Sequence, residues 1–242
     1  MIGCSGTRLA SARGGRDSPL VGDELMFGSS GVSADSLFLT AWDALFARAT
    51  LRPGATLLVH AAGSGVGTAA IQIARLVGAR SIGTARSAAK LEPARALGMG
   101  HGIVVDGKRP AFADETIARS TGGAGADVIL DGIGAAYLEE NLRALAPLGT
   151  CVVIGLLGGA TGSLSLGALL AKRATLVGTV LRSRPLEEKI ALSRRFEAEA
   201  LPALESGALR PVVAATLPAT EAAEAHRRLE ASEVFGKIVL AW

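Results

Sequence analysis

Hydrophobic and polar positions follow two alternating periods between residues 56 and 181. Stretches with apolar residues at helical spacing, such as Val66, Ala70, Ile73 and Val77, alternate with short apolar runs of strand length. The apolar runs lie at residues 56–61, 80–84, 103–105, 127–130, 150–155 and 176–180. Apolar strands that alternate with helices are typical of a parallel sheet covered on both faces. The pattern therefore predicts an α/β fold, a doubly wound parallel sheet of six strands.

Helices are predicted between these strands and in the C-terminal part of the chain. The first would run over residues 34–49, with Ser33 as its cap. Five more are expected at residues 66–77, 87–97, 112–121, 137–145 and 164–171. The tail predicts a helix at 187–205, a strand at 210–217, a helix at 221–230 and a strand at 237–241. Residues 1–33 are irregular, with a short strand expected near 25–27.

Composition excludes several classes of protein. The chain has 242 residues, 49% of them hydrophobic, which is enough apolar side chain to bury a core and excludes a disordered protein. Its 31 glycines follow no three-residue period, so it is not collagen-like. Two distant cysteines, Cys4 and Cys151, exclude a disulfide scaffold. The net charge is +3 without a cluster of Lys and Arg, so no nucleic-acid partner is expected.

One stretch without charged residues, from 144 to 171, is long enough to span a bilayer. It contains Pro147 and six glycines, and a buried strand followed by a glycine-rich loop explains it better than a membrane span. The first twenty residues lack the apolar stretch of a signal peptide. A cytoplasmic protein with reduced cysteines and no membrane span is therefore expected.

The motif with the most specific chemistry is a glycine-rich turn at residues 61–67. An apolar strand leads into this AAGSGVG segment, and an amphipathic helix follows it. Glycines let the backbone turn tightly and approach a pyrophosphate, and the helix N-terminus offers free N–H groups to that anion. Thr68 stands where the third glycine of the usual motif would be. Dinucleotide binding is predicted, with a purely structural glycine turn as the alternative.

The end of the second predicted strand indicates which dinucleotide would bind. NAD sites place Asp or Glu about 20 residues after the glycine turn, where it holds the ribose 2′-OH. No acidic residue occurs between positions 61 and 89, whereas Arg86, Ser87 and Lys90 can meet a 2′-phosphate. NADP(H) is therefore favoured over NAD(H), unless Arg86 and Lys90 are only solvated surface charges.

Several short motifs occur in order along the chain besides the glycine turn: 38–46 (FLTAWDALF), 127–131 (DVILD), 141–147 (NLRALAP), 153–159 (VIGLLGG) and 235–240 (FGKIVL). Together they resemble the quinone oxidoreductase family, the zinc-free branch of the medium-chain dehydrogenase/reductase superfamily, and most closely its p53-inducible quinone oxidoreductase-like subgroup. The resemblance extends over residues 37–242. It implies NADPH-dependent hydride transfer to a quinone or another α,β-unsaturated carbonyl.

The resemblance also implies a set of cofactor-binding residues. The pyrophosphate would be held by Ala61, Ser64, Gly65, Val66 and Gly67. The adenosine ribose phosphate would be held by Thr84, Arg86, Ser87 and Lys90. The nicotinamide would be bordered by Ile154, Gly155 and Leu156, with Thr40 on the same side. The C-terminal end would reach the cofactor through Phe235, Gly236 and Lys237.

The resemblance is incomplete at the N-terminus. Family members begin with a β-rich, chaperonin-10-like substrate domain, whereas only 33 residues precede the matched region here, of which 21–26 resemble a late segment of that domain. The expected organisation is an irregular N-terminal remnant (1–33), a dinucleotide-binding Rossmann domain (34–185) and a C-terminal segment of the truncated substrate domain (186–242). Family dimers extend the parallel sheet edge to edge, so a homodimer is implied.

No catalytic acid, base or metal site is expected. The histidines His60, His101 and His226 are scattered and form no zinc-ligand cluster with the cysteines. His60 is expected to be structural because nothing supplies its partner group, and Tyr137, the only tyrosine, is also expected to be structural. Hydride transfer is chemistry of the cofactor itself, so catalytic residues stay unassigned. Two functions remain open, an NADPH-dependent quinone or enone reductase and a nucleotide-binding module without turnover.

Overall fold

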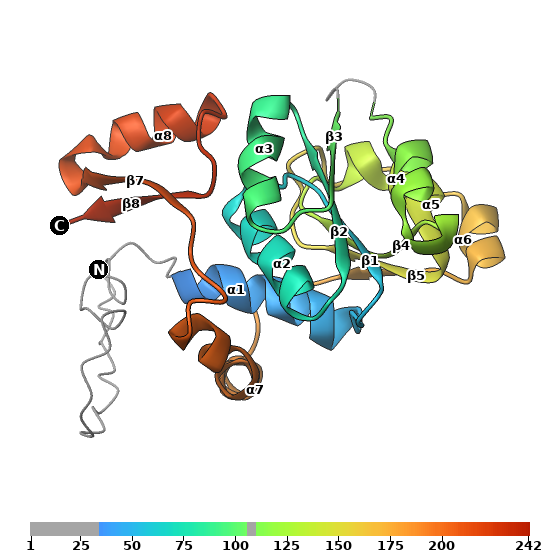
Figure 1. Ribbon diagram of the computed structural model, residues 1–242, viewed down its shortest axis with the longest axis horizontal. Coiled ribbons are helices and arrows are strands. Elements are labelled where there is room, and N and C mark those ends of the chain that lie inside the picture. Colours follow the sequence, from blue (N-terminus) through green and yellow to red (C-terminus); the bar gives the residue numbers. More distant parts are fainter. Residues whose placement is uncertain (1–33, 106–109) are drawn as a thin grey trace.

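The computed structural model describes residues 34–105 and 110–242 (Figure 1). Six parallel strands form one sheet in the spatial order β3-β2-β1-β4-β5-β6. They are β1 (Thr56–Val59), β2 (Arg80–Ala85), β3 (His101–Val104), β4 (Ala126–Asp131), β5 (Leu145–Val153) and β6 (Thr175–Gly178). The order reverses between β1 and β4, as in a doubly wound Rossmann sheet. The predicted fold class is therefore confirmed, and each of the six strands predicted between residues 56 and 181 overlaps an observed one.

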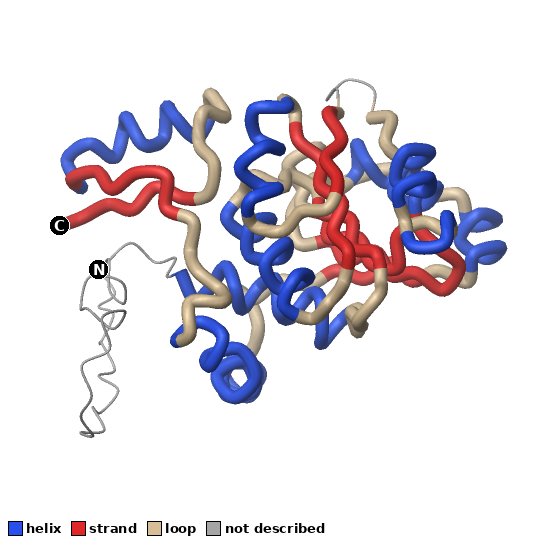
Figure 2. Tube along the Cα trace, in the orientation of Figure 1, coloured by secondary structure: helices blue, strands red, loops and turns tan. Residues whose placement is uncertain are grey.

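Helices cover both faces of this sheet (Figures 1 and 2). One face carries α1 (Ala34–Trp42), α2 (Gly65–Leu76), α3 (Ala88–Ala96) and α7 (Leu186–Glu205). The other face carries α4 (Ala113–Arg119), α5 (Leu138–Ala144) and α6 (Leu166–Lys172). Because side chains alternate along a strand, Leu57 and Val59 pack in the first core while Leu58 packs in the second. The near-continuous apolar strands of the sequence reflect this two-sided burial.

The charge-free stretch from residue 144 to 171 contains all of strand β5, a glycine-rich loop and most of helix α6. This confirms the prediction of a strand followed by a loop. Within residues 34–105 and 110–242, no helix has the length and apolar character needed to cross a membrane.

The last part of the chain forms a second, smaller unit. Strand β7 (Val213–Pro218), helix α8 (Ala222–Glu230) and strand β8 (Lys237–Ala241) make a β-α-β crossover, in which β7 and β8 pair in parallel. We refer to residues 213–241 as the C-terminal unit. Figure 1 shows the end of α8 beside α3 of the large sheet.

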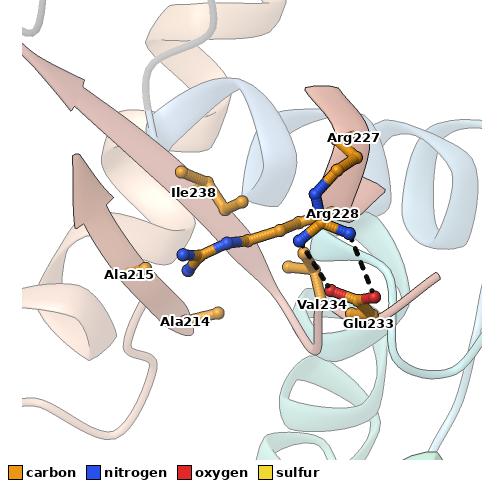
Figure 3. A pocket seen from close by; sticks show the side chains of 7 residues that line it. All are labelled: Ala214, Ala215, Arg227, Arg228, Glu233, Val234 and Ile238. Atoms are coloured by element: carbon orange, nitrogen blue, oxygen red, sulfur yellow. Dashed lines mark hydrogen bonds and ion pairs between the residues drawn. The ribbon is translucent and has the colours of Figure 1, made fainter. Parts of the chain in front are cut away.

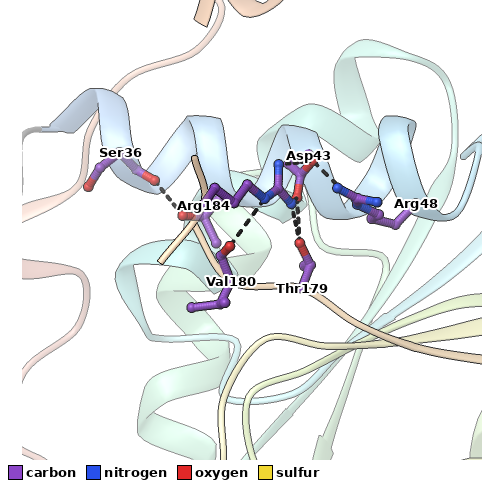
Figure 4. A network of polar contacts seen from close by, with 7 residues as sticks. Ser36, Asp43, Arg48, Thr179, Val180 and Arg184 are labelled. Atoms are coloured by element: carbon purple, nitrogen blue, oxygen red, sulfur yellow. Dashed lines mark hydrogen bonds and ion pairs between the residues drawn. The ribbon is translucent and has the colours of Figure 1, made fainter. Parts of the chain in front are cut away.

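The predicted helix at 34–49 is not one regular α-helix. It is α-helical to Trp42 and continues as a π-helix over Asp43–Arg48. The Asp43 carboxylate is buried and accepts hydrogen bonds from Arg184 Nη1 at 3.1 Å and Thr179 Oγ1 at 2.8 Å, with Arg48 Nε at 3.6 Å (Figure 4). This junction ties the start of the described chain to the segment that follows β6.

Some expectations fall on parts of the chain that the structure does not describe. The Ser33 cap, the strand near 25–27, the segment at 21–26 and Cys4 all lie outside the described residues. The division of the chain after residues 33 and 185 stays a prediction. Helix α7 follows the second of these positions, and it packs Leu192 and Phe196 into the core of the first sheet face.

Candidate functional site

A cleft of about 710 Å³ lies between the glycine-rich turn and the C-terminal unit. It opens where β1 and β2 end, next to the reversal of strand order, the usual place for ligands in open α/β sheets. Half of the predicted cofactor-binding residues line it: Ala61, Ser64, Gly65, Thr84, Arg86, Lys90, Gly236 and Lys237. The predicted pyrophosphate, ribose-phosphate and C-terminal groups therefore meet at one cleft.

The glycine-rich turn has the geometry of an anion-binding helix start. Ser64 caps α2, since its hydroxyl accepts a hydrogen bond from the Gly67 N–H at 3.0 Å. A Cβ on Gly67 would come within 2.5 Å of the Ala61 carbonyl oxygen, so only glycine fits there. Ala61 itself has a φ of 51°, which is rare for a residue with a side chain. Ser64 therefore satisfies the Gly67 N–H, and Gly65, the first residue of α2, lines the cleft.

The C-terminal unit is fastened to this turn. The Gly236 N–H donates to the Gly63 carbonyl at 2.8 Å, and Ser64 and Gly236 form a parallel bridge. A Cβ on Gly63 would lie 3.0 Å from the Phe235 ring, and one on Gly65 would lie 2.5 Å from Lys237 Cε. The glycine-rich turn forms one wall of the cleft and the C-terminal unit forms the other. The C-terminal unit therefore packs directly against the glycines of the turn.

Three cations converge on the cleft without an anionic partner. The side chains of Arg86, Lys90 and Lys237 make no hydrogen bond or ion pair with other residues of the described part of the chain. Burial lowers the pKa of Lys90, and the nearby positive charge of Arg86 lowers it further. Lys237 also lies against the start of α2, where the helix dipole is positive. Such an arrangement favours a bound anion.

Glu230 from α8 also lines the cleft, although no ion pair joins it to these cations. The sequence holds no acidic residue between positions 61 and 89, but Glu230 belongs to α8, far along the chain. An acidic group can therefore reach the same cleft from a distant element.

His60, just after β1, lies behind the cleft in a buried polar network. Its Nε2 is 2.6 Å from Asn141 Oδ1 and its Nδ1 is 2.9 Å from Thr84 Oγ1. Asn141 donates through Nδ2 to Asp131 at 2.9 Å, so its oxygen faces His60, which must carry its proton on Nε2. Nδ1 then accepts from the Thr84 hydroxyl. Burial lowers the pKa of His60, which keeps the ring neutral.

Both ring nitrogens of His60 have hydrogen-bond partners, as is expected of a satisfied structural histidine. The partners come from Thr84 on β2 and Asn141 on α5, which are distant in sequence. His60 itself does not line the cleft. Full hydrogen bonding in a buried position is typical of a structural histidine.

The other half of the predicted residues do not line the cleft. Thr40 lies within α1 and donates to the Ser36 carbonyl at 2.6 Å. Ile154 donates its N–H to the Asp131 carbonyl at 2.7 Å, beside Gly155, and Leu156 is exposed. The remaining ones are Val66, Gly67, Ser87 and Phe235, which lie within two residues of a lining residue in the chain.

Several lining residues were not predicted: Gly63, Ala85, Ile133, Ala136, Tyr137, Leu157, Gly158, Leu229, Glu230, Ser232 and Val234. Ile133 to Tyr137 follow β4, next to the reversal of strand order, and that position could have signalled them. No sequence pattern near the residues between Leu229 and Val234 predicts that they line the cleft. They reach the cleft only because the C-terminal unit docks on the glycine turn.

A smaller pocket of about 340 Å³ lies within the C-terminal unit, lined by Arg227, Arg228 and Glu233 among others (Figure 3). Its charges are paired: Arg227 Nε lies 2.7 Å from Glu224 and Nη1 lies 3.3 Å from Glu233. Arg228 also contacts Glu224 at 2.7 Å. This pocket therefore lacks the unbalanced positive charge of the cleft.

Comparison with known proteins identifies the family. The fold and cleft are those of a Rossmann-type α/β protein, and residues 65–198 match the family model described as zinc-binding dehydrogenase. The chain belongs to this family. Residues 34–105 and 110–242 do not fit a zinc site, since they hold no group of three or more His, Cys, Asp or Glu side chains that could bind a metal ion.

Two characterised relatives are oxidoreductases. The chain is 34% identical to a 2-haloacrylate reductase of Burkholderia sp. over 78% of its length, and 32% identical to the rat (Rattus norvegicus) quinone oxidoreductase over 84%. It covers 56% and 59% of these relatives, so it spans little more than half their length. The predicted resemblance to medium-chain dehydrogenases/reductases is thereby confirmed.

Solved structures of similar fold also include a dehydrogenase and a nucleotide-bound protein. An NAD-dependent alcohol dehydrogenase is 40% identical and superposes with a TM-score of 0.73 over 85% of this chain and 56% of its own. A mycobacterial protein complexed with NADPH is 28% identical, with a TM-score of 0.74 over 89% of this chain and 67% of its own. The two structures are described with different nicotinamide cofactors.

Proposed function

We propose that the chain is the cofactor-binding part of an NADPH-dependent oxidoreductase that transfers hydride to a quinone or another α,β-unsaturated carbonyl. One observation carries the proposal: Arg86, Lys90 and Lys237 converge, unpaired, on a cleft that begins at a glycine-rich helix start. A ligand with several phosphate groups would balance this charge. The activity of the quinone oxidoreductase and haloacrylate reductase relatives supports the acceptor class.

The residues of the cleft fit such a ligand. Gly65, the first residue of α2, lines the cleft, and the start of this helix would offer N–H groups to a pyrophosphate. Arg86 and Lys90 would hold the 2′-phosphate, which favours NADPH over NADH. The bound cofactor supplies the hydride, while the chain orients it and excludes water. A homodimer joined at the unpaired edge of β6, beside the exposed Leu166 and Leu170, belongs to the same proposal.

Isothermal titration of NADPH and NADH tests the proposal. The double variant Arg86→Gln/Lys90→Gln should bind NADPH at least about 100-fold more weakly, because each charge-assisted phosphate contact contributes about 1.5–3 kcal/mol. NADH binding should change little. Arg95→Gln, on the same helix α3 but paired with Glu92, is the matched control and should bind like the unchanged chain. Tighter binding of NADH than of NADPH would contradict the cofactor assignment.

A second measurement separates turnover from binding alone. NADPH oxidation that depends on an added quinone supports the oxidoreductase. NADPH binding without turnover supports the alternative, a nucleotide-binding module. Absence of any nucleotide binding would overturn both.

A further inference from the structure

Tyr137 lines the cleft but has no part in the cofactor contacts proposed above. It ends a short 3-10 turn, Ala135–Tyr137, between β4 and α5. This places it at the reversal of strand order, where the cleft floor is formed.

The ring of Tyr137 is held in one orientation. It packs edge-on against His60 with ring centroids 4.8 Å apart, and against Phe112 at 5.2 Å. His60 is fixed in turn by its hydrogen bonds to Thr84 and Asn141. Only 7% of Tyr137 is exposed, so the small accessible part has a defined direction.

The hydroxyl belongs to that accessible part. It makes no hydrogen bond with any residue that the structure describes, and a buried tyrosine hydroxyl normally has a partner. The buried unpartnered side-chain atoms among the described residues are Ser81 Oγ and Thr116 Oγ1, so the Tyr137 hydroxyl is open to the cleft. Burial raises its pKa most, and Asp131 raises it further while Arg86 opposes this. The group therefore stays protonated and is a hydrogen-bond donor at neutral pH.

We propose that Tyr137 is a specificity-determining residue of the cleft, whose hydroxyl donates a hydrogen bond to the phosphate that Arg86 and Lys90 attract. This inference rests on the proposed function. The two cations would balance the charge of the phosphate, and the rigid phenol would fix its direction. A neutral donor on a packed ring loses little side-chain freedom when the ligand binds.

Tyr137→Phe removes only this hydroxyl and breaks no hydrogen bond within the described protein. NADPH should bind the variant about 10-fold more weakly, while NADH, which lacks the 2′-phosphate, should bind as before. Phe112→Leu is the matched control, because it loosens the same ring packing but keeps the hydroxyl. If Tyr137 were merely structural, Phe112→Leu would reduce NADPH binding and Tyr137→Phe would not. That result would overturn the inference, as would an equal loss for both nucleotides.

Tyr137 is the only tyrosine of the chain, so its hydroxyl can be observed directly. In protein labelled with ¹³C at tyrosine Cζ, NADPH should shift the single resonance and NADH should shift it less. Equal shifts would contradict the contact with the phosphate. If the unchanged chain bound neither nucleotide, the proposed function would fail and this inference with it. If it bound NADPH and Tyr137→Phe bound equally well, this inference alone would fail.

Discussion

Two regions of the molecule gather positive side chains, and they differ in whether an anion accompanies them. At the junction of the π-helix with the segment after β6, Arg184 and Arg48 surround the buried carboxylate of Asp43 (Figure 4). In the cleft, Arg86, Lys90 and Lys237 have no such partner among residues 34–105 and 110–242. A paired cluster holds elements together. An unpaired cluster raises the free energy of the ligand-free protein, and a bound anion lowers that free energy again.

The largest effect should follow from breaking the paired cluster. Arg184→Met leaves the Asp43 carboxylate buried without its closest cation. Only Arg48, which is partly exposed and 3.6 Å away, would then balance its negative charge. We expect the free energy of unfolding to fall by about 3 kcal/mol, as for other buried pairs that lose one partner. Guanidinium chloride unfolding measures this. Arg182→Met, exposed and two residues earlier, is the control, and an equal loss in both variants would show that the pair does not stabilise the fold.

A smaller and opposite effect is expected in the cleft. Lys237→Met removes a cation that lies against the positive end of α2, so the free protein should keep or gain stability. NADPH binding should weaken about 10-fold, since one charge-assisted contact is lost. Lys237→Arg keeps the charge and should retain most of the affinity. Loss of unfolding free energy in Lys237→Met would mean that this lysine is structural, like Arg184.

The smallest effect concerns the neutral network around His60, and it depends on pH. Burial lowers the pKa of His60 below its usual 6.5. As the pH falls below 6.5, His60 is therefore protonated in the unfolded chain while it is still neutral in the folded protein. The neutral His60 network therefore contributes fully to the free energy of unfolding above pH 6.5, and this contribution declines as the pH falls below that value. His60→Gln should flatten this decline in denaturant titrations between pH 7 and 5. His101→Gln, whose ring contacts Glu115 at the surface, should retain it.

The sheet was predictable because its signal is local. Runs such as residues 57–59 and 128–130 are apolar throughout, since these parts of β1 and β4 are buried, and such runs identify strands without tertiary information. The glycine-rich turn was predictable for the same reason. The strand, the glycines and the helix follow one another directly in the sequence. Glycine is required at position 67 because a Cβ there would clash with the carbonyl of Ala61, only six residues earlier.

The rest depends on contacts between distant residues. The π-helical turn at 43–48 is stabilised by Thr179 and Arg184, which the local pattern of the first helix does not reveal. Tyr137 was expected to be structural because it lies in the part of the sequence that forms the sheet. Its ring does pack in the core, and its hydroxyl is also open to the cleft. Glu230 reaches the cleft only through the docking of the C-terminal unit.

The hydrogen bond between Gly236 and Gly63 has a consequence for the order of events during synthesis. The ribosome makes β1 and the glycine turn long before the residues of β8, and N-terminal parts of a chain fold first. The nascent sheet therefore exists for a time with only one wall of the cleft. At that stage a nucleotide would meet only the wall that the glycine turn and β2 provide. A premature stop before Gly236 would accordingly yield a folded sheet with a half-built cleft.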